Sequence, residues 1–291
     1  MAGMRKYGSS YGFTLIELSI VLVIIGLIVG GVLVGQELIR AAAVRATIAQ
    51  IEKYNTAANT FYGKYGYLPG DITNTAALQF GFQARGADQY GGNTLQGNGD
   101  GIIWGLGGYG WNCGGETFMF WVDLSAAGLI DSNFNTATPI NCNGTTQTNT
   151  NLFVPEAKIG QGNFVTVWSD FCPSCGSTSP YTGNYYGISN ILMLAGGGSA
   201  VTATNGLRVS QAYSIDQKMD DGFPTSGKVL AYYANELLGT LWAGTANSTT
   251  AVSGSSTTCY DNGGNTANPV VYSIRQNGGA GVNCAISVRF Q

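Results

Sequence analysis

The sequence contains no histidine among its 291 residues. Histidine is the most common general base in enzymes and a frequent metal ligand, so its absence closes the easiest routes to acid–base catalysis and to an imidazole-ligated metal site. The chain also lacks a phosphate-binding loop motif and the turn motif that carries a nucleophilic serine. We therefore expect a protein that is not an enzyme and has no catalytic residues.

Charged residues are scarce, because Asp, Glu, Lys and Arg together make up only 10% of the chain. Arg5 and Lys6 precede a long apolar segment, which leaves 11 of the 13 basic residues, against 16 acidic ones, in the rest of the chain. A mildly acidic body offers no basic surface for phosphates, so duplex nucleic acid is not an expected partner. Hydrophobic residues still make up 44%, which indicates a folded, glycine-rich body and not a disordered one.

No cysteine occurs before residue 113, and the six that follow are Cys113, Cys142, Cys172, Cys175, Cys259 and Cys284. An even number of cysteines in an exported chain predicts disulfides formed in an oxidising compartment. Sequence proximity favours the pairs Cys113–Cys142, Cys172–Cys175 and Cys259–Cys284, although the sequence alone does not exclude other pairings. A redox or zinc site at Cys172–Cys175 is the alternative, but no thioredoxin-like unit or further zinc ligand accompanies it.

The long apolar segment covers residues 13–35, FTLIELSIVLVIIGLIVGGVLVG, with a single charge at Glu17. A helix of this length is about 35 Å long and can span the hydrocarbon core of a bilayer. The basic flank lies before the segment, so the N-terminus is expected to stay cytoplasmic while the rest is exported. A conventional signal peptide has a shorter apolar core with a small residue after it, whereas here the small residue, Gly12, comes before the apolar run.

The residues Gly12-Phe13-Thr14-Leu15-Ile16-Glu17 resemble the cleavage and methylation motif of type IV prepilins and of type II secretion pseudopilins. The resemblance implies that residues 1–12 are a leader that prepilin peptidase removes after Gly12, and that Phe13 becomes an N-methylated N-terminus. It also implies an inner-membrane precursor, a filament built from copies of this chain with residues 13–35 in its core, and an assembly platform driven by a separate ATPase.

Glu17 is expected to act in assembly. A carboxylate within a membrane helix is costly unless it has a partner, and no Lys or Arg lies within a turn or two of it. The nearest positive charge that cleavage creates is the amine of Phe13, on the same subunit or on a neighbouring one. Contact with lipid headgroups is the simpler alternative. Gly26, Gly30 and Gly31 would let such helices approach one another closely.

The helix is expected to continue as an amphipathic segment over residues 36–65. Its apolar residues recur at a spacing near 3.5, at Val44, Ile48, Ile51, Ala58, Phe61 and Tyr65. Gly66 and Pro69 should end it, and Pro69-Gly70-Asp71 opens a turn. The sequence thus predicts an α+β fold, with a long N-terminal helix packed on the antiparallel sheet of a globular body at residues 66–291. Pilins have the same architecture, which is an expectation from the resemblance.

Short apolar runs in the body alternate with clusters of Gly, Asn, Ser and Thr. They predict strands at Asn163–Trp168, Gly206–Val209, Lys228–Tyr233, Val270–Ile274 and Ala285–Phe290. Two short helices are expected at Glu116–Ala127 and Ala234–Ala243. Long surface loops are expected at residues 136–151 and 244–268.

Two acidic segments are candidate sites for a structural calcium ion, the only cofactor that the sequence suggests. Asn98 and Asp100 alternate with glycines, as oxygen ligands do in calcium loops, although the leading Asp and the final Glu of such a loop are missing. Asp216, Asp220 and Asp221 form the second group, in which neighbouring carboxylates repel and need a cation or backbone donors. A tight turn is the alternative at the first segment.

The main functional hypothesis is a pilin, a structural subunit of a type IV pilus-like filament. A type II secretion pseudopilin and a minor pilin at the filament tip are the alternatives, and an exported enzyme or binding domain tethered by the helix is a more remote one. The expected location is the inner membrane for the precursor, followed by an extracellular pilus or the cell surface, or the periplasm for a pseudopilin. Adhesion, motility, DNA uptake and secretion are all compatible with the sequence.

Overall fold

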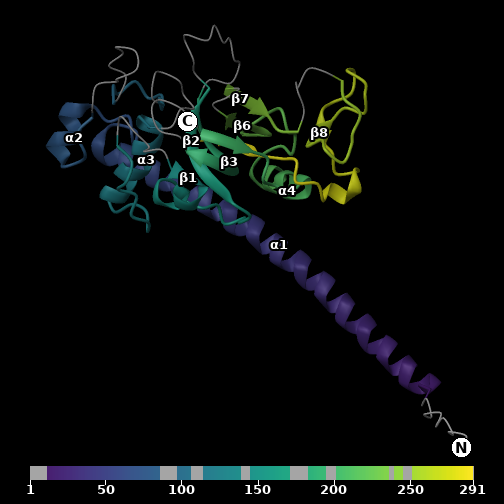
Figure 1. The fold of residues 1–291 in the computed structure, drawn as a ribbon. Coiled ribbons are helices and arrows are strands. Elements are labelled where there is room, and N and C mark those ends of the chain that lie inside the picture. Colours follow the sequence, from purple (N-terminus) through teal and green to yellow (C-terminus); the bar gives the residue numbers. More distant parts are fainter. Residues whose placement is uncertain are drawn as a thin grey trace, which may run out of the picture. The chain divides into compact units, whose positions relative to one another are not determined.

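A computed structural model describes residues 12–85, 97–105, 114–138, 145–170, 183–194, 201–235, 239–244 and 251–290. The chain divides into two compact units, residues 1–42 and residues 43–291. Figure 1 shows the long helix α1 (Leu15–Tyr65), which begins in the first unit and ends in the second. The predicted helix end is confirmed, because Gly66 leaves the helix with a φ of 78°.

The part of α1 that belongs to the second unit buries an apolar face. Val44, Ile51 and Phe61 are buried there, and Ile48 and Tyr65 pack against the same core, as the spacing predicted. Tyr54 contacts two other elements, with ring centroids 4.9 Å from Trp121 and 6.3 Å from Tyr186. The core of the body therefore joins α1 to a helix and to the central strand of the sheet.

A six-stranded sheet forms the middle of the body, and all its neighbouring strands are antiparallel. Its strands are β1 (Thr145–Thr146), β2 (Asn163–Ser169), β3 (Asn184–Leu194), β4 (Val201–Thr204), β5 (Val229–Leu230) and β10 (Ile286–Arg289). The first half of β3 pairs with β2 and β10, and its second half with β1 and β4. β5 pairs with β10, so β10 lies between β3 and β5. The predicted α+β fold is confirmed.

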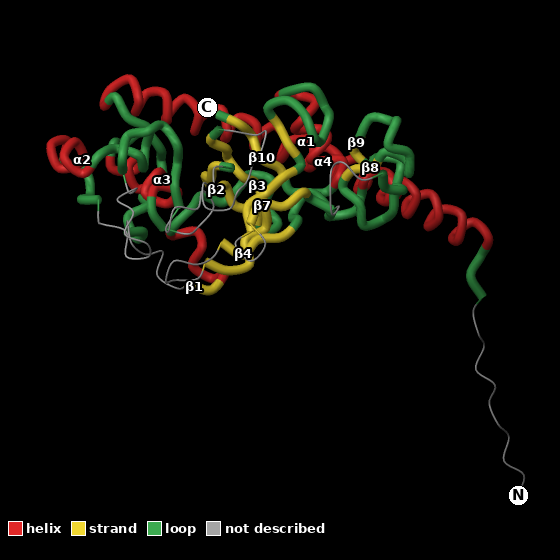
Figure 2. Tube along the Cα trace, turned by 90° about the horizontal axis from the view of Figure 1, so that it is seen from above, coloured by secondary structure: helices red, strands yellow, loops and turns green. Residues whose placement is uncertain are grey.

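The remaining elements surround this sheet. They are α2 (Asn74–Phe80), α3 (Glu116–Ala126), α4 (Val209–Met219), the 3-10 helices η2 (Gln147–Leu152) and η4 (Asn277–Gly279), and the strands β6 (Tyr232–Asn235), β7 (Gly239–Trp242), β8 (Tyr260–Asp261) and β9 (Val271–Tyr272). Figures 1 and 2 show α2 and α3 at one end, the sheet in the middle, and α4 with β8 and β9 at the other end.

Several predicted elements are confirmed, because α3, β2 and β10 lie where the sequence placed a helix and two strands, and β9 forms within a third predicted strand. Two predictions are wrong. The predicted helix at residues 234–243 is wrong, since residues 234–235 and 239–242 belong to the antiparallel pair β6–β7, in which Tyr233 lies opposite Leu241. Residues 206–209 are not a strand either, because only Leu207 forms a bridge, to Cys284, and Val209 already begins α4. The strand expected at residues 228–233 is interrupted at Ala231, between β5 and β6.

One predicted disulfide is confirmed. Cys259 and Cys284 are bonded, with their Cα atoms 5.1 Å apart, and both side chains are fully buried. The other four cysteines, Cys113, Cys142, Cys172 and Cys175, lie outside the described residues.

Candidate functional site

The processing motif forms the start of α1, and its polar residues bind one another. Thr14 donates two hydrogen bonds to Glu17 Oε2, from its backbone N–H at 2.8 Å and from its hydroxyl at 2.7 Å. The Glu17 N–H in turn donates to Thr14 Oγ1 at 3.3 Å. This reciprocal arrangement is a capping box, which satisfies backbone donors that a helix start otherwise leaves unpaired. The Thr-x-x-Glu pattern at residues 14–17 is the sequence signature of a capping box, and the expected role of Glu17 in assembly did not include it.

The capping box occupies only one carboxylate oxygen of Glu17. Within the described residues, Oε1 makes no hydrogen bond. Phe13 next to the cap is 91% exposed, and a Cβ added at Gly12 would meet nothing within 4 Å. The predicted cleavage position is therefore accessible, and Glu17 keeps one oxygen for a partner from another chain.

The first part of α1 is apolar on all sides. Every large hydrophobic side chain from Leu15 to Val34 is at least half exposed. α1 is also the one helix in the described residues that is long and apolar enough to cross a membrane, with a mean hydropathy of 2.9 in its most apolar window. The helix continues through Gly30 and Gly31, and a side chain added at either would meet nothing within 4 Å. A surface of this kind requires lipid or other apolar helices around it.

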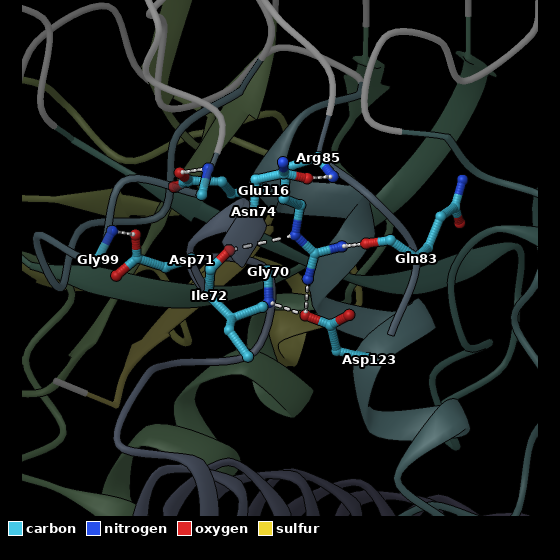
Figure 3. Close-up of polar contacts among 10 residues, drawn as sticks. Gly70, Asp71, Ile72, Asn74, Gln83, Arg85, Gly99, Glu116 and Asp123 are labelled. Carbon is cyan, nitrogen blue, oxygen red and sulfur yellow. Dashed lines mark hydrogen bonds and ion pairs between the residues drawn. The ribbon is translucent and has the colours of Figure 1, made fainter. Parts of the chain in front are cut away.

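A buried acidic network lies at the α2–α3 end of the body (Figure 3), and the sequence did not predict it. The carboxylate of Asp71 accepts from the N–H groups of Gly99 and Gly101, at 2.7 and 2.8 Å. Glu116, at the start of α3, accepts from the N–H groups of Gly97 and Trp104, both at 2.7 Å. The two acids thus hold the backbone of the segment 97–104.

An ion pair completes this network. Arg85 Nη2 donates to Asp123 Oδ2 at 2.5 Å, and both side chains are buried almost completely, with 1% and 0% exposure. The same Asp123 oxygen accepts from the N–H of Gly70 at 2.7 Å, and Arg85 Nε donates to the carbonyl of Ile72. The pair therefore ties the turn that follows α1 to α3 (Figure 3).

The candidate calcium ligands Asn98 and Asp100 lie in the segment that Asp71 and Glu116 hold. Asn98 Nδ2 donates to Asp100 Oδ2 at 2.7 Å, and the N–H of Ile102 donates to Asp100 Oδ1 at 2.8 Å. Both side chains thus take part in a tight turn, which was the alternative interpretation. Calcium binding at these two residues stays a prediction.

The second candidate group is brought together at the end of α4. Oxygens of Asp216, Asp220 and Asp221 lie within 4.8 Å of one another. Asp216 is buried and accepts from the N–H of Gly222 and from the hydroxyl of Tyr272, at 3.0 and 2.8 Å. Asp220 accepts from the backbone of Val229, and Asp221 from that of Phe223. Backbone N–H groups therefore already donate hydrogen bonds to all three carboxylates. Calcium binding at this group also stays a prediction.

Burial changes the protonation of several of these acids. It raises the pKa of Asp71 to about 7, against the effect of the two glycine N–H donors. It raises the pKa of Asp216 to about 7 as well, and that of Glu116 well above its ordinary value. Burial also raises the pKa of Asp123, and the guanidinium beside it opposes that rise.

The body is expected to be more stable at about pH 5 than at about pH 8. Burial raises the pKa of Glu116 above its ordinary value. Asp71 and Asp216 release their protons near pH 4 in the unfolded chain but only near pH 7 in the folded one. Their contribution is fully present below about pH 4 and is lost as the pH rises through about 7. We expect the Tm of the full chain to fall between these two pH values, and Asp71→Asn to reduce that fall. A Tm that rises over the interval contradicts the prediction.

Comparison with protein families gives one match. Residues 8–33 match the family described as the prokaryotic N-terminal methylation motif. The match includes Gly12, Phe13 and Glu17, so it confirms the resemblance that these residues suggested. A comparison with curated proteins found no match, and a comparison with solved structures found none.

Proposed function

On the premise that this chain carries the signal motif of type IV pilins and pseudopilins, we propose that it is a structural subunit of a type IV pilus-like filament. The observation that supports this most strongly is the motif followed directly by a helix whose apolar side chains are exposed from Leu15 to Val34. Such a helix fits an inner-membrane-anchored precursor before assembly. In the filament the same helices would bundle in the core and cover one another.

Electrostatics would guide each new subunit into the filament. Cleavage after Gly12 creates a positively charged amine at Phe13, and Glu17 has one oxygen outside its capping box. Pairing of the incoming amine with that oxygen neutralises both charges where water is excluded, because opposite charges attract strongly at low dielectric. The axial offset between neighbouring helices would follow from this contact.

The proposal includes the partners that the motif implies. Prepilin peptidase would cut and methylate the chain, and an inner-membrane platform with a separate ATPase would extrude the polymer to the cell surface. A pseudopilin of a type II secretion system, confined to the periplasm, is the second candidate, because it carries the same motif. The large size of the body favours a surface-exposed pilin over this alternative, whereas the Cys259–Cys284 disulfide fits both, because the periplasm is oxidising as well.

Mass spectrometry of the N-terminus tests the proposal. Assembled material is expected to begin at Phe13 with one added methyl group, and to lack residues 1–12. Gly12→Leu should block cleavage, because a side chain replaces the bare backbone at the cut, and the uncleaved precursor should accumulate in the membrane. Gly3→Leu, outside the matched residues 8–33, is the matched control and should be processed normally. Assembled material that retains the leader would overturn the proposal.

Deletion of the gene followed by imaging of the cell surface separates the finer roles. Loss of all fibres identifies a major pilin, whereas fibres that persist identify a minor subunit or a pseudopilin.

A further inference from the structure

A cleft lies at the α4 end of the body, opposite the buried acidic network. Its volume is about 690 Å³, within the range of about 300–1,000 Å³ that is usual for small-molecule sites. One wall is formed by α4 and the turn after it, and the other by residues 261–276. We call it the α4 cleft, and its residues that matter most are Tyr213, Gln217, Phe223, Val271, Arg275 and Gln276.

Apolar side chains on both walls of the α4 cleft are open to solvent. Phe223 is 42% exposed on one wall, and Val271 is 41% exposed on the other. Tyr213 also lines the cleft and packs edge-on against Tyr272, with ring centroids 5.8 Å apart. Aromatic rings present an electron-rich face that attracts weakly positive hydrogens, such as the C–H groups on one face of a sugar ring.

Polar groups with unused hydrogen-bonding capacity surround this surface. The side chains of Gln217, Arg275 and Gln276 make no hydrogen bond to any residue that the structure describes, and all three line the cleft. Each glutamine amide carries both donors and an acceptor, and the guanidinium carries several donors in one plane. Groups of this kind match the neighbouring hydroxyls of a carbohydrate, which also donate and accept.

The charge of the cleft argues against an acidic ligand. Two carboxylates, Asp221 and Asp261, stand against the single guanidinium of Arg275. Both carboxylates already accept hydrogen bonds from within the protein. Asp221 accepts from the N–H of Phe223 at 2.8 Å, and Asp261 accepts from the hydroxyl of Ser273 at 2.5 Å. The free polar groups are therefore mainly neutral amides, which favours a neutral, polyhydroxylated ligand over a phosphate.

One buried residue, Asp216, connects the two walls of the cleft. Buried Asp216 accepts from the N–H of Gly222 on the first wall, at 3.0 Å, and from the hydroxyl of Tyr272 on the second, at 2.8 Å. The Cys259–Cys284 disulfide closes the chain segment that forms the second wall. A site that is fixed before the ligand arrives loses less entropy on binding.

We propose that the α4 cleft is a carbohydrate-binding site. A neutral sugar ring would stack on Phe223, and its hydroxyls would bind Gln217, Arg275 and Gln276. This activity goes beyond the structural role of the subunit, because polymerisation does not require it.

An array of immobilised oligosaccharides built from neutral hexoses and N-acetylhexosamines tests the proposal. The full-length protein is purified in a detergent without a sugar headgroup, since such a headgroup would compete for the site. We expect binding to a subset of the array and a loss of about tenfold in affinity for Phe223→Ala, with a comparable loss for Gln217→Ala. Leu192→Ala on β3 is the matched control, because Leu192 is 41% exposed and lies outside the cleft.

Equal binding by Phe223→Ala and Leu192→Ala would overturn the proposal, as would the absence of binding to every oligosaccharide. A peptide array run in parallel covers the other class of ligand, and binding to peptides without binding to sugars would also overturn it. The Tm of each variant is measured, and the unchanged Tm expected for these exposed positions attributes any loss of binding to the cleft.

Discussion

Asp123→Ala is expected to lower the free energy of unfolding by about 3–5 kcal/mol, because it leaves Arg85 charged and buried without its partner. The substitution also removes the acceptor for the N–H of Gly70. The turn that follows α1 would lose both of these connections to α3 at once. Denaturant unfolding of the full chain, monitored by tryptophan fluorescence, measures the effect, since Trp121 lies on α3 close to the change.

Asp131→Ala is the matched control for this prediction. Asp131 also pairs with a basic residue, Lys53, but both side chains of that pair are exposed to solvent. Exposed ion pairs contribute little, because water and salt screen them. A loss of stability in Asp131→Ala as large as that in Asp123→Ala would show that burial does not determine the cost.

Glu17→Gln is expected to reduce the yield of filaments by about tenfold or more, while the precursor still enters the membrane and is still cleaved. Glutamine keeps an oxygen that accepts from Thr14, so the helix cap survives, but it carries no charge to pair with the amine of Phe13. The substitution therefore separates the two roles of Glu17. Electron microscopy counts the filaments, and mass spectrometry of the membrane fraction verifies cleavage.

Glu37→Gln serves as the control, because Glu37 is an exposed acid on the same helix and its partner, Arg40, lies one turn away. It should assemble normally. If Glu17→Gln also gave filaments in normal yield, the charge of Glu17 would have no part in docking, and its role would be limited to capping α1.

The sequence predicted best where a pattern was long or specific. The apolar run and its amphipathic continuation predicted the helix α1, and Gly66 and Pro69 predicted its end at Tyr65. The processing motif was identified from fixed distances among Gly12, Phe13 and Glu17, and the family match includes all three. The Cys259–Cys284 pair followed from proximity in the chain alone.

Strand β3, the centre of the sheet, was missed for a physical reason. It pairs on both sides and most of its residues are buried, so it lacks the alternation of apolar and polar residues that marks a half-exposed strand. Gly187 also interrupts the run of strand-forming residues in the sequence. A Cβ atom at this position would come within 2.9 Å of Thr166 Oγ1 on β2. The glycine is thus required by the side chains of β2, which no local pattern reveals.

The wrong helix at residues 234–243 shows the opposite error. Its short apolar run is compatible with a helix or a strand, and pairing of Tyr232 with Trp242 across β6 and β7 decides between them. The buried network escaped prediction because Asp71 and Arg85 lie far along the chain from Glu116 and Asp123, which are both on α3. Only the fold brings these residues together, so no spacing rule could have identified them.

The position of β10 would set an order for folding during the export that we propose. Its residues Ile286–Arg289 insert between β3 and β5, which precede it in the chain. Until they have emerged from the membrane, β3 has an open edge that can pair with another chain, and β5 has no neighbour in the sheet. If the body is exported as we propose, the sheet is completed only after the end of the chain has crossed the membrane, and a subunit held midway would be exposed to aggregation.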